Sequence, residues 1–418
     1  MRLSKNKPKF KVHVTSEVGR LNAVLLHKPG VEIERMTPAN ASEALYSDIL
    51  NKRIVDSEYG NFCGFFEKVS SVYYVNEVLE ALLEDDDLCN SLVTQSCLAE
   101  GAGYLVDELM QKSIKDIVKA LIEGFEYRKG IDPDCYESRR YVLRPLYNLF
   151  FTRDASSSVY DRVLINSMSF DVRKRENLIF KAIFKHYFGC ELLNAQEWDK
   201  NAHTEGGDVQ IGGPDFLCIG EGIRTDAKGI KYLANTFIDR PKFNIIVQEL
   251  PHHPDSFIHL DMVYTFLDKN QCMMYEPMLR KSAEFAGKAT TWIEVSNGNI
   301  KYHSCKNMIS ALKNVGVEME PVFCGGDDLW MQQREQWHSG ANFFCFAPGK
   351  VIGYRRNSHT IDAMDKAGFS VLNAEDIVAG RVNVDDYNRC VVTFAASELP
   401  RAGGGARCMT MPINRDDE

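Results

Sequence analysis

Short apolar segments bounded by turn residues alternate with amphipathic helical patterns along most of the 418-residue chain. This alternation narrows the possible folds, because strands separated by helical segments form sheets that are covered by those helices. In segment 172–187 the apolar residues form one helical stripe. We therefore expect an α/β body. Its predicted strands span residues 21–27, 163–168, 216–219, 272–275, 343–347, 351–354 and 391–395.

One region departs from this alternation. From about Tyr74 to Tyr141 there is little strand signal, and apolar residues between Leu105 and Ile122 recur at the three- and four-residue spacing of a helix. The acidic run 84–87 in this region is more typical of a solvated helix end than of a binding site. No low-complexity linker flanks the region. We predict a helical insertion, residues 74–141, in a catalytic domain formed by residues 1–73 and 142–418.

The charge balance excludes some function classes. The chain has 49 Lys and Arg against 58 Asp and Glu, a net charge of −9, which argues against a protein that binds nucleic-acid phosphates. A small cationic substrate is compatible with this balance. The basic N-terminal segment is not followed by an apolar stretch, and no apolar run is long enough to span a bilayer. We expect a cytoplasmic protein with no nucleic-acid or membrane partner.

The twelve cysteines do not form a metal-binding pattern. None occurs in a C-x-x-C pair, so the spacings of zinc sites, iron–sulfur clusters and thioredoxin-like motifs are absent. Reduced cysteines usually pack as small core residues. We assign eleven of them to packing and treat Cys408 separately.

Two polar side chains, His259 and Asp261, interrupt the apolar segment 256–267. A buried polar group is costly without a partner. If the segment is a strand, both side chains point to the same side of it. That side is either the wall of an active site or a satisfied hydrogen bond in the core, and these residues alone do not decide between them.

Glu205 and Asp208 flank a pair of glycines in the sequence Glu-Gly-Gly-Asp. Paired glycines allow a sharp turn or a close approach to a ligand, and two neighbouring carboxylates suit acid–base catalysis or the binding of a cation. A solvated loop is the alternative. A second Gly-Gly-Asp, at 325–327, is too short to establish a repeat, and turn chemistry explains both copies.

Two further segments could contribute to a site. Residues 148–154 end an aromatic, strand-like run with a polar cluster that includes Asp154, although such clusters are more typical of strand ends. Near the end of the sequence, an expected exposed loop of three glycines, 403–405, leads to Arg407 and Cys408. A thiol becomes a useful nucleophile when a cation lowers its pKa, or when the substrate brings positive charge to it. Arg407 is a candidate for such a cation.

In this order, the motifs resemble those of the arginine deiminases, members of the guanidine-modifying (pentein) superfamily. The resemblance covers nearly the whole chain and is loosest over 51–141. It implies a five-bladed, pseudo-symmetric α/β propeller with a helical subdomain inserted after the first blade. The matching segments are 20–30, 149–154, the Glu205 and His259 motifs, 334–337, 347–349 and 407–412.

The resemblance also implies hydrolysis of L-arginine to L-citrulline and ammonia through a covalent Cys–amidino (thiouronium) intermediate. It assigns the nucleophile to Cys408 and the general acid, then base, to His259. Asp154 and Asp261 would clamp the guanidinium, Glu205 would hold the imidazole, and Asp208 would support them. The substrate's amino-acid end would contact Asn148, Phe151, Arg173 and Arg224.

One position departs from the family pattern. Many members carry another carboxylate-binding arginine where this chain has Gly403, which leaves open whether Arg401 compensates for it. The resemblance implies no metal or organic cofactor, because the substrate is itself a cation.

Two other functions stay open on these residues. One is an amidinotransferase, which would pass the amidino group of arginine to an amine. The other is a non-catalytic guanidine-binding protein. A papain-like protease is disfavoured, because its cysteine–glycine signature is absent near the N-terminus. An assembly of identical subunits is compatible with the sequence.

Overall fold

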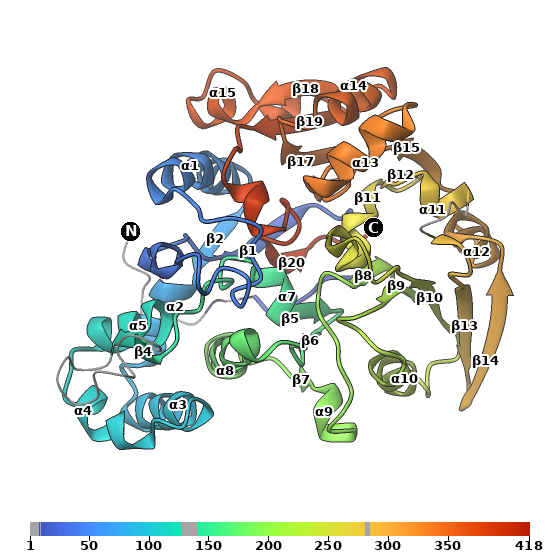
Figure 1. Cartoon of the computed structure of the whole chain (residues 1–418). Helices are drawn as coiled ribbons and strands as arrows, with labels where there is room; N and C mark the ends of the chain where they lie inside the picture. The colour runs from blue at the N-terminus through green and yellow to red at the C-terminus, as the bar shows by residue number, and fades with distance from the viewer. Residues whose placement is uncertain (1–7, 9, 127–139, 281–284) are drawn as a thin grey trace.

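Five β-sheets lie around the centre of the molecule (Figure 1). The computed structural model describes residues 8, 10–126, 140–280 and 285–418. Within these residues, the five sheets contain three to five strands each, and a sixth sheet contains two. The fold is therefore mixed α/β, as the alternating sequence pattern predicts.

The five larger sheets share one unit, in which a strand has an antiparallel neighbour on one side and a parallel neighbour on the other. The first unit joins distant parts of the chain: β1 (Leu21–Leu26), β2 (Ser71–Tyr74) and β20 (Met411–Arg415). The other four units are β5 (Ser156–Val159), β6 (Arg162–Ile165) and β7 (Leu192–Leu193); β8 (Val209–Gly213), β9 (Phe216–Glu221) and β10 (Phe243–Glu249); β11 (Tyr264–Asp268), β12 (Gln271–Met274) and β15 (Glu320–Phe323); and β16 (Phe344–Ala347), β17 (Lys350–Tyr354) and β19 (Cys390–Phe394).

Three strands extend these units, and two others pair alone. The extending strands are β13 (Thr290–Ser296), β14 (Asn299–Cys305) and β18 (Ser370–Asn373), and the isolated pair is β3 (Phe125–Glu126) with β4 (Tyr141–Leu143).

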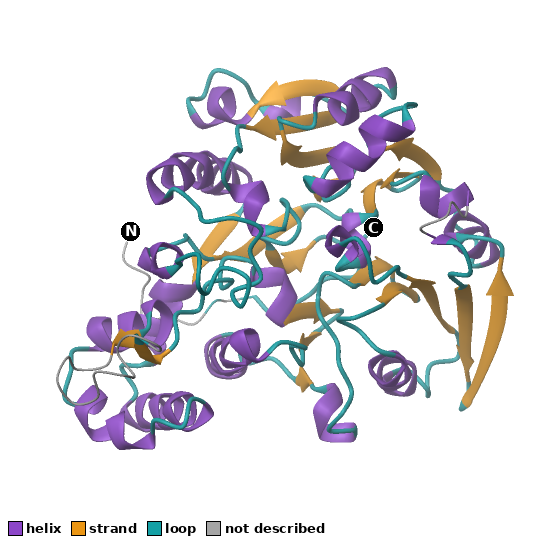
Figure 2. Ribbon diagram, viewed as in Figure 1, coloured by secondary structure: helices purple, strands orange, loops and turns teal. Residues whose placement is uncertain are grey.

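Helices cover the outer sides of several sheets. Figure 2 shows α8 (Lys174–Ala182), α9 (Ala195–Trp198) and α10 (Ala227–Thr236) outward of the central strands. The remaining α-helices are α1 (Lys52–Val69), α2 (Val75–Leu82), α3 (Asp86–Ala99), α4 (Val106–Met110), α5 (Ile114–Glu123), α7 (Thr152–Ala155), α11 (Pro277–Arg280), α12 (Met308–Asn314), α13 (Leu329–Trp337), α14 (Ser358–Lys366) and α15 (Ala374–Val378).

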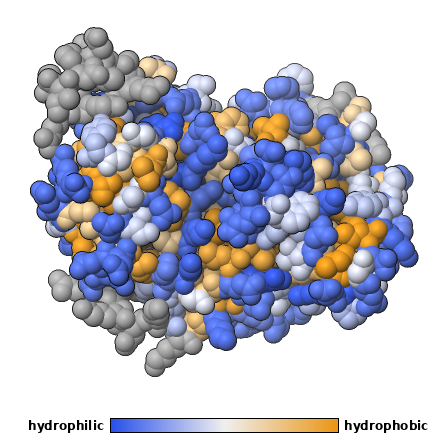
Figure 3. Space-filling model, turned by 90° about the horizontal axis from the view of Figure 1, so that it is seen from below, coloured by the Kyte–Doolittle hydropathy of each residue, from blue (hydrophilic) through white to orange (hydrophobic). Residues whose placement is uncertain are grey.

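Apolar side chains are buried mainly in four clusters. On the face shown in Figure 3, apolar residues form smaller groups among hydrophilic ones. No helix in the described part of the chain is long and apolar enough to cross a membrane. One of the clusters contains Cys408 together with Phe150 and Phe151, so the predicted nucleophile lies within the core.

All seven predicted strands are confirmed, with ends that differ by a few residues at most. The predicted helix over 172–187 is also confirmed: α8 continues into a π-helical turn, Ile183–Tyr187. These elements depend on local apolar periodicity, which the sequence displays directly.

The strand considered over 256–267 is wrong in its first part. Asp255–Phe257 and Leu260–Met262 form 3₁₀ turns, and β11 begins only at Tyr264. The backbone N–H of Leu260 donates to Asp208 Oδ1, and that of Asp261 donates to Gly207 O. These two N–H groups therefore bond to the 205–208 turn instead of to a neighbouring strand.

The aromatic run before Asp154 is likewise not a strand. Residues 147–150 form turns, and Asp154 itself lies in the short helix α7. The amide N–H of Phe151 donates to Asn148 O, and that of Asp154 donates to Phe151 O. Consecutive local turns of this kind replace the extended ladder.

The region predicted as an insertion contains helices α2 to α5. Its apolar residues, such as Val78 and Leu121, belong to the same buried cluster as Ala23 and Leu25 of β1. These helices therefore share a core with the sheet that β1 joins. The part of the prediction over 127–139, including Cys135, lies outside the described residues.

Candidate active site

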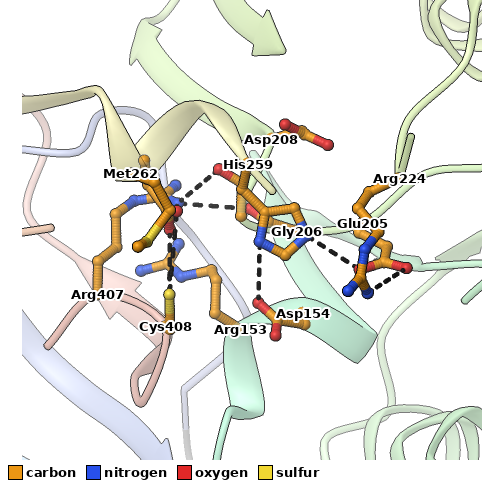
Figure 4. A network of polar contacts seen from close by, with 12 residues as sticks. Arg153, Asp154, Glu205, Gly206, Asp208, Arg224, His259, Met262, Arg407 and Cys408 are labelled. Atoms are coloured by element: carbon orange, nitrogen blue, oxygen red, sulfur yellow. Dashed lines mark hydrogen bonds and ion pairs between the residues drawn. The ribbon is translucent and has the colours of Figure 1, made fainter. Parts of the chain in front are cut away.

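Cys408 lies just before β20 and is almost fully buried, with 1% of its surface exposed. Its Sγ lies 3.7 and 3.9 Å from the two carboxylate oxygens of Asp261 (Figure 4). The preceding residue, Arg407, donates to Asp261 Oδ2 through Nη1 (2.9 Å) and to Glu17 Oε1 through Nη2 (2.9 Å). Two consecutive residues thus contact Asp261, one through the thiol and one through the guanidinium.

The glycine loop that leads to Cys408 is mostly buried, so the expected exposed loop is wrong. Gly403 is partly exposed and has a φ of 88°, a conformation that favours glycine, whereas Gly404 and Gly405 are buried. A Cβ on Gly404 would lie 2.4 Å from the Phe151 ring, and one on Gly405 would lie 2.6 Å from the Asn342 side chain. Close packing therefore requires glycine at the second and third positions.

Arg401, the residue considered next to Gly403, pairs with carboxylates at the surface. Its guanidinium Nη1 pairs with Asp48 Oδ2 at 3.2 Å and with Glu398 Oε1 at 3.6 Å, and the side chain is exposed. The 3₁₀-helix that holds it, Leu399–Ala402, is anchored at its start by Glu58. The carboxylate of Glu58 accepts the backbone N–H groups of Ser397, Glu398 and Leu399.

His259 lies opposite, between two carboxylates. Its Nε2 lies 2.9 Å from Glu205 Oε2, and its Nδ1 lies 3.9 Å from Asp154 Oδ1 (Figure 4). Burial disfavours the charged ring, but Asp154 and Glu205 outweigh that effect and raise the pKa of His259 to about 9. The ring is therefore an imidazolium at neutral pH.

The turn 205–208 is shaped to admit this ring. A Cβ on Gly207 would lie only 2.3 Å from His259 Nδ1, and one on Gly206 would lie 1.9 Å from Arg153 O. The two glycines therefore allow the turn to contact both the imidazole and helix α7. This close approach explains why the turn places Glu205 within hydrogen-bond distance of the ring.

Glu205 is fully buried and charged. Its carboxylate accepts Arg224 Nη1 (3.1 Å) and the backbone N–H of Ser169 (3.0 Å). Burial favours the neutral acid, but Arg224 and His259 hold the pKa of Glu205 well below its usual range. The Arg224 guanidinium also lies over the Phe170 ring, 4.5 Å from its centroid.

Asp154 is held by Arg173, which sequence reasoning assigned to the substrate's carboxylate. Arg173 Nη1 lies 2.7 Å from Asp154 Oδ2, and Arg173 Nη2 lies 2.8 Å from Glu176 Oε2. Asn148 O accepts a longer hydrogen bond, 3.4 Å, from Arg173 Nη2. The other oxygen, Asp154 Oδ1, has no hydrogen-bond partner among the described residues.

Asp208 and Phe151 are placed at the edges of this group. Asp208 is fully buried, and its Oδ1 accepts the backbone N–H of Leu260 (2.9 Å). Burial raises the pKa of Asp208 to about 7. Phe151 packs against Phe150, with ring centroids 4.1 Å apart, and contacts the glycine loop. The structure thus places the ten predicted residues in one region, but Asn148 contacts the others through its backbone, because its side-chain amide donates to Ala44 O (2.8 Å).

Three buried residues in this region were missed by sequence reasoning: Glu17, Arg153 and Asn342. Burial opposes the charge on Glu17, but Arg407 and Arg153 lower its pKa to about 2. Burial and the neighbouring Arg407 lower the pKa of Arg153 to about 9. Asn342 contacts Cys408 directly. Its signal in the sequence is one amide at the start of the apolar run 341–347, a polar residue that burial leaves unexplained.

The Cys408 thiol is neutral at ordinary pH. Burial raises its pKa well above the usual value, and Asp261 and Asp154 raise it further. Arg407 opposes these effects only weakly, since its guanidinium pairs with Glu17 and Asp261. Arg407, the candidate cation, does lower the pKa of the thiol, but burial and the two carboxylates outweigh its effect.

The arrangement suits a planar cation. Carboxylates on two sides can accept hydrogen bonds from its N–H groups. Next to them lie a buried thiol, which can act as a nucleophile, and an imidazolium, which can donate a proton. Among the described residues, no group of three or more His, Cys, Asp or Glu side chains could hold a metal ion.

Comparison with known proteins gives a consistent family. A family model described as arginine deiminase matches residues 45–415. The arginine deiminase of Limosilactobacillus fermentum is 30% identical, over 97% of this chain and 99% of its own. That of Listeria innocua is also 30% identical, over 97% and 98%, and that of Oenococcus oeni is 28% identical, over 98% of each chain.

Solved structures with this fold include more distant proteins. SxtG, an amidinotransferase from Microseira wollei, matches with a TM-score of 0.57 at 13% identity, over 97% of this chain and 98% of its own. A dimethylarginine dimethylaminohydrolase matches with a TM-score of 0.51 at 12% identity, over 94% and 99%. At such low identity, these likenesses concern the fold alone.

Proposed function

The chain belongs to the arginine deiminase family, and from that premise we propose how its residues hydrolyse L-arginine to L-citrulline and ammonia. It is a hydrolase that acts on the C–N bond of a linear amidine. One observation carries the assignment of the site: Cys408, His259 and the carboxylates of Asp154, Glu205 and Asp261 converge in one buried place.

Substrate binding begins with the guanidinium. This group is a poor electrophile, because resonance stabilises it and it stays charged at physiological pH. Asp154 and Asp261 bind its N–H groups by charge-assisted hydrogen bonds and fix its plane. The unpartnered Oδ1 of Asp154 and the proximity of Asp261 to the thiol support this role. The carbon of the guanidinium is thereby held next to Cys408 Sγ.

Substrate charge activates the thiol. Asp261 and Asp154 raise the pKa of Cys408 in the free enzyme, and a bound guanidinium neutralises both carboxylates. The pKa of the thiol falls and its proton passes to water. The thiolate then attacks the guanidinium carbon, and the C=N electron pair moves to nitrogen to give a neutral tetrahedral adduct.

His259 then moves two protons. As an imidazolium it protonates one amino group of the adduct, so that the C–N bond breaks and ammonia leaves a thiouronium on Cys408. The neutral imidazole next takes a proton from water, whose oxygen attacks the same carbon. The C–S bond then breaks with its electron pair on sulfur, and the hydroxyl proton of this second adduct passes to water, which releases citrulline and the thiolate. Glu205 holds the ring in position for both steps.

The amino-acid end of the substrate lies toward Asn148, Phe151, Arg173 and Arg224. Arg224 is the best placed for the α-carboxylate, because its buried Nε has no hydrogen-bond partner among the described residues. Arginine nitrogens suit a carboxylate geometrically. Arg173 would have to exchange some of its present hydrogen bonds to Asp154 and Glu176. Asp208 supports the His259 segment through the Leu260 amide.

A citrulline assay tests this proposal. Purified protein with arginine should produce citrulline, and Cys408→Ala should produce none, while Cys97→Ala, a buried cysteine of helix α3, should retain activity. Activity in Cys408→Ala would refute the mechanism. Addition of glycine or ornithine distinguishes the amidinotransferase alternative, which would yield a guanidino product without ammonia. A guanidine-binding protein would bind arginine and release neither product.

The finer organisation follows from the same family. The unit shared by five sheets supports a five-bladed, pseudo-symmetric propeller, the pentein fold. Helices α2 to α5 support an insertion over 74–141 between 1–73 and 142–418. Eleven described cysteines are unpaired, which supports a reducing, cytoplasmic location. The reaction requires no metal or cofactor, because the bound substrate supplies the positive charge.

A further inference from the structure

The side-chain amide of Asn342 contacts Cys408 through both of its ends, the nitrogen at the sulfur and the oxygen at the backbone. The residue follows α13, precedes β16 and is 1% exposed. Its Oδ1 accepts the backbone N–H groups of Arg407 (2.9 Å) and Cys408 (3.3 Å). Its Nδ2 lies 3.2 Å from Cys408 Sγ and 3.2 Å from Asp261 O. One side chain therefore contacts the nucleophilic sulfur and the peptide groups that carry it.

The hydrogen-bond network fixes the orientation of this amide. Two backbone N–H donors point at one end, and only the amide oxygen can accept them. The nitrogen must then face the sulfur and Asp261 O, and both of these are acceptors. The absence of a Cβ on Gly405 leaves room for the side chain, because a Cβ there would lie 2.6 Å from Asn342 Oδ1.

The charges around Cys408 show why such a donor matters. Asp261 and Asp154 both oppose ionisation of the thiol, and Arg407 pairs with Glu17 and Asp261. Tyr354 is neutral, because burial raises its pKa well above the usual value. Among the described residues, the donors aimed at the sulfur are the Asn342 amide and the Gly405 backbone. A neutral donor stabilises a thiolate without competing with the substrate's cation for Asp261.

We propose that Asn342 is a catalytic residue whose amide N–H stabilises the Cys408 thiolate during attack and again when citrulline leaves. The role rests on the proposed function of Cys408 as nucleophile. It parallels an oxyanion hole, with sulfur in place of oxygen and with the donor set in place before the substrate binds. Asn342 Oδ1 also holds the Arg407 and Cys408 amides, so donor and nucleophile are positioned by the same group.

Two substitutions separate the donor role from the structural one. Asn342→Asp retains an oxygen that can accept both backbone N–H groups but loses the N–H donor. Asn342→Ala loses the donor and the acceptor and adds no charge. Asn244→Asp is the matched control, because Asn244 is a buried amide of β10 that bonds Asp215 O and Trp292 outside the site.

We expect kcat to fall about a hundredfold in both Asn342 variants, with KM changed less than about threefold. Iodoacetamide labelling of Cys408, followed by mass spectrometry across pH, should have its midpoint raised by about one pH unit or more in each. Asn244→Asp should match the wild type in both measurements. Thermal melting shows that each variant is folded.

Two outcomes would overturn the inference. Wild-type kcat and midpoint in Asn342→Asp would show that only the acceptor contacts matter. If the alkylation midpoint of Asn342→Ala matches the wild type, any shift of the midpoint in Asn342→Asp comes from its added charge. If Asn342→Ala does not fold, wild-type kcat and a wild-type midpoint in Asn342→Asp would still overturn the donor role. Failure of the underlying mechanism is separate, because it would appear as citrulline production by Cys408→Ala.

Discussion

The molecule contains two Gly-Gly-Asp turns with different surroundings. In the turn at 206–208 both glycines are buried. Asp208 is also fully buried, and it accepts the backbone N–H of Leu260, the residue after His259. In the turn at 325–327, Gly325 and Gly326 have φ values of 77° and 71°, and Asp327 is exposed. The first turn requires glycine because other atoms lie close to both of its glycines. In the second turn both glycines have a left-handed backbone, and at Gly325 the backbone of Gln332 also lies too close for a side chain.

The same three letters therefore occur for two physical reasons. A Cβ at Gly207 would lie 2.3 Å from His259 Nδ1, whereas the nearest atom to a Cβ at Gly326 is 3.7 Å away. Only the first turn contacts residues of the proposed active site. A short motif consequently indicates a turn, and its burial decides whether the turn belongs to the active site.

Substitution of Gly207 and Gly326 by alanine should produce the largest difference in kcat/KM between the two turns. Gly207→Ala would displace His259 from Glu205, and we expect kcat/KM to fall about a hundredfold or more. Gly326→Ala strains a left-handed residue by about 1 kcal/mol and should lower the melting temperature without changing kcat/KM. Citrulline assays and thermal melts measure both. Equal losses of activity in the two variants would contradict the contrast.

The first turn should also determine the pH dependence. His259 beside Glu205 has a pKa raised to about 9, so its acid form persists below that pH and is lost above it. We expect kcat/KM to fall about tenfold per pH unit beyond about pH 9. Alkylation of Cys408 in the free enzyme should instead rise over this range, because the pKa of its thiol is raised. Fast alkylation at about pH 6 would contradict activation by the substrate.

Asp208→Asn tests the carboxylate of the first turn. Asp208 is one of the carboxylates that raise the pKa of His259, so its neutralisation should move the alkaline limb of kcat/KM to lower pH by less than about one unit. The amide oxygen can still accept the Leu260 N–H. Because the pKa of Asp208 is raised to about 7, wild type and variant should differ little below that pH and increasingly above it. An unchanged limb would remove Asp208 from the site.

Asp328→Asn, next to the second turn, should have the smallest effect. Asp328 Oδ1 accepts the N–H groups of Trp330 and Met331 at the start of α13, and asparagine caps a helix about as well. Loss of the charge should cost less than about 1 kcal/mol. Melting should shift slightly, and kcat/KM and its pH profile should match the wild type. A changed pH profile would connect the second turn to the catalytic ionisations.

Local patterns predicted much of this molecule, and contacts between distant residues account for what they missed. The strands and helix α8 follow from apolar periodicity within a few residues. Six of the ten candidate site residues were singled out by local sequence features, and the family resemblance added the other four and assigned the roles. Segment 256–263 was misread because its backbone donors bond to the 205–208 turn. Glu17 was missed because its partner Arg407 lies 390 positions away. The pairing of Arg401 with Asp48 is likewise visible only in the fold.

The pairing of β1 with β20 has a consequence for the order of folding. It joins residues 21–25 to residues 411–415, and the entropy lost on closing so long a loop makes this contact a late one. Until it forms, Asp154, Glu205 and His259 can assemble without Cys408 in place. Incompletely folded chains should therefore leave arginine intact. Citrulline production during refolding should lag behind the recovery of circular dichroism, so that activity reports the final closure of the chain.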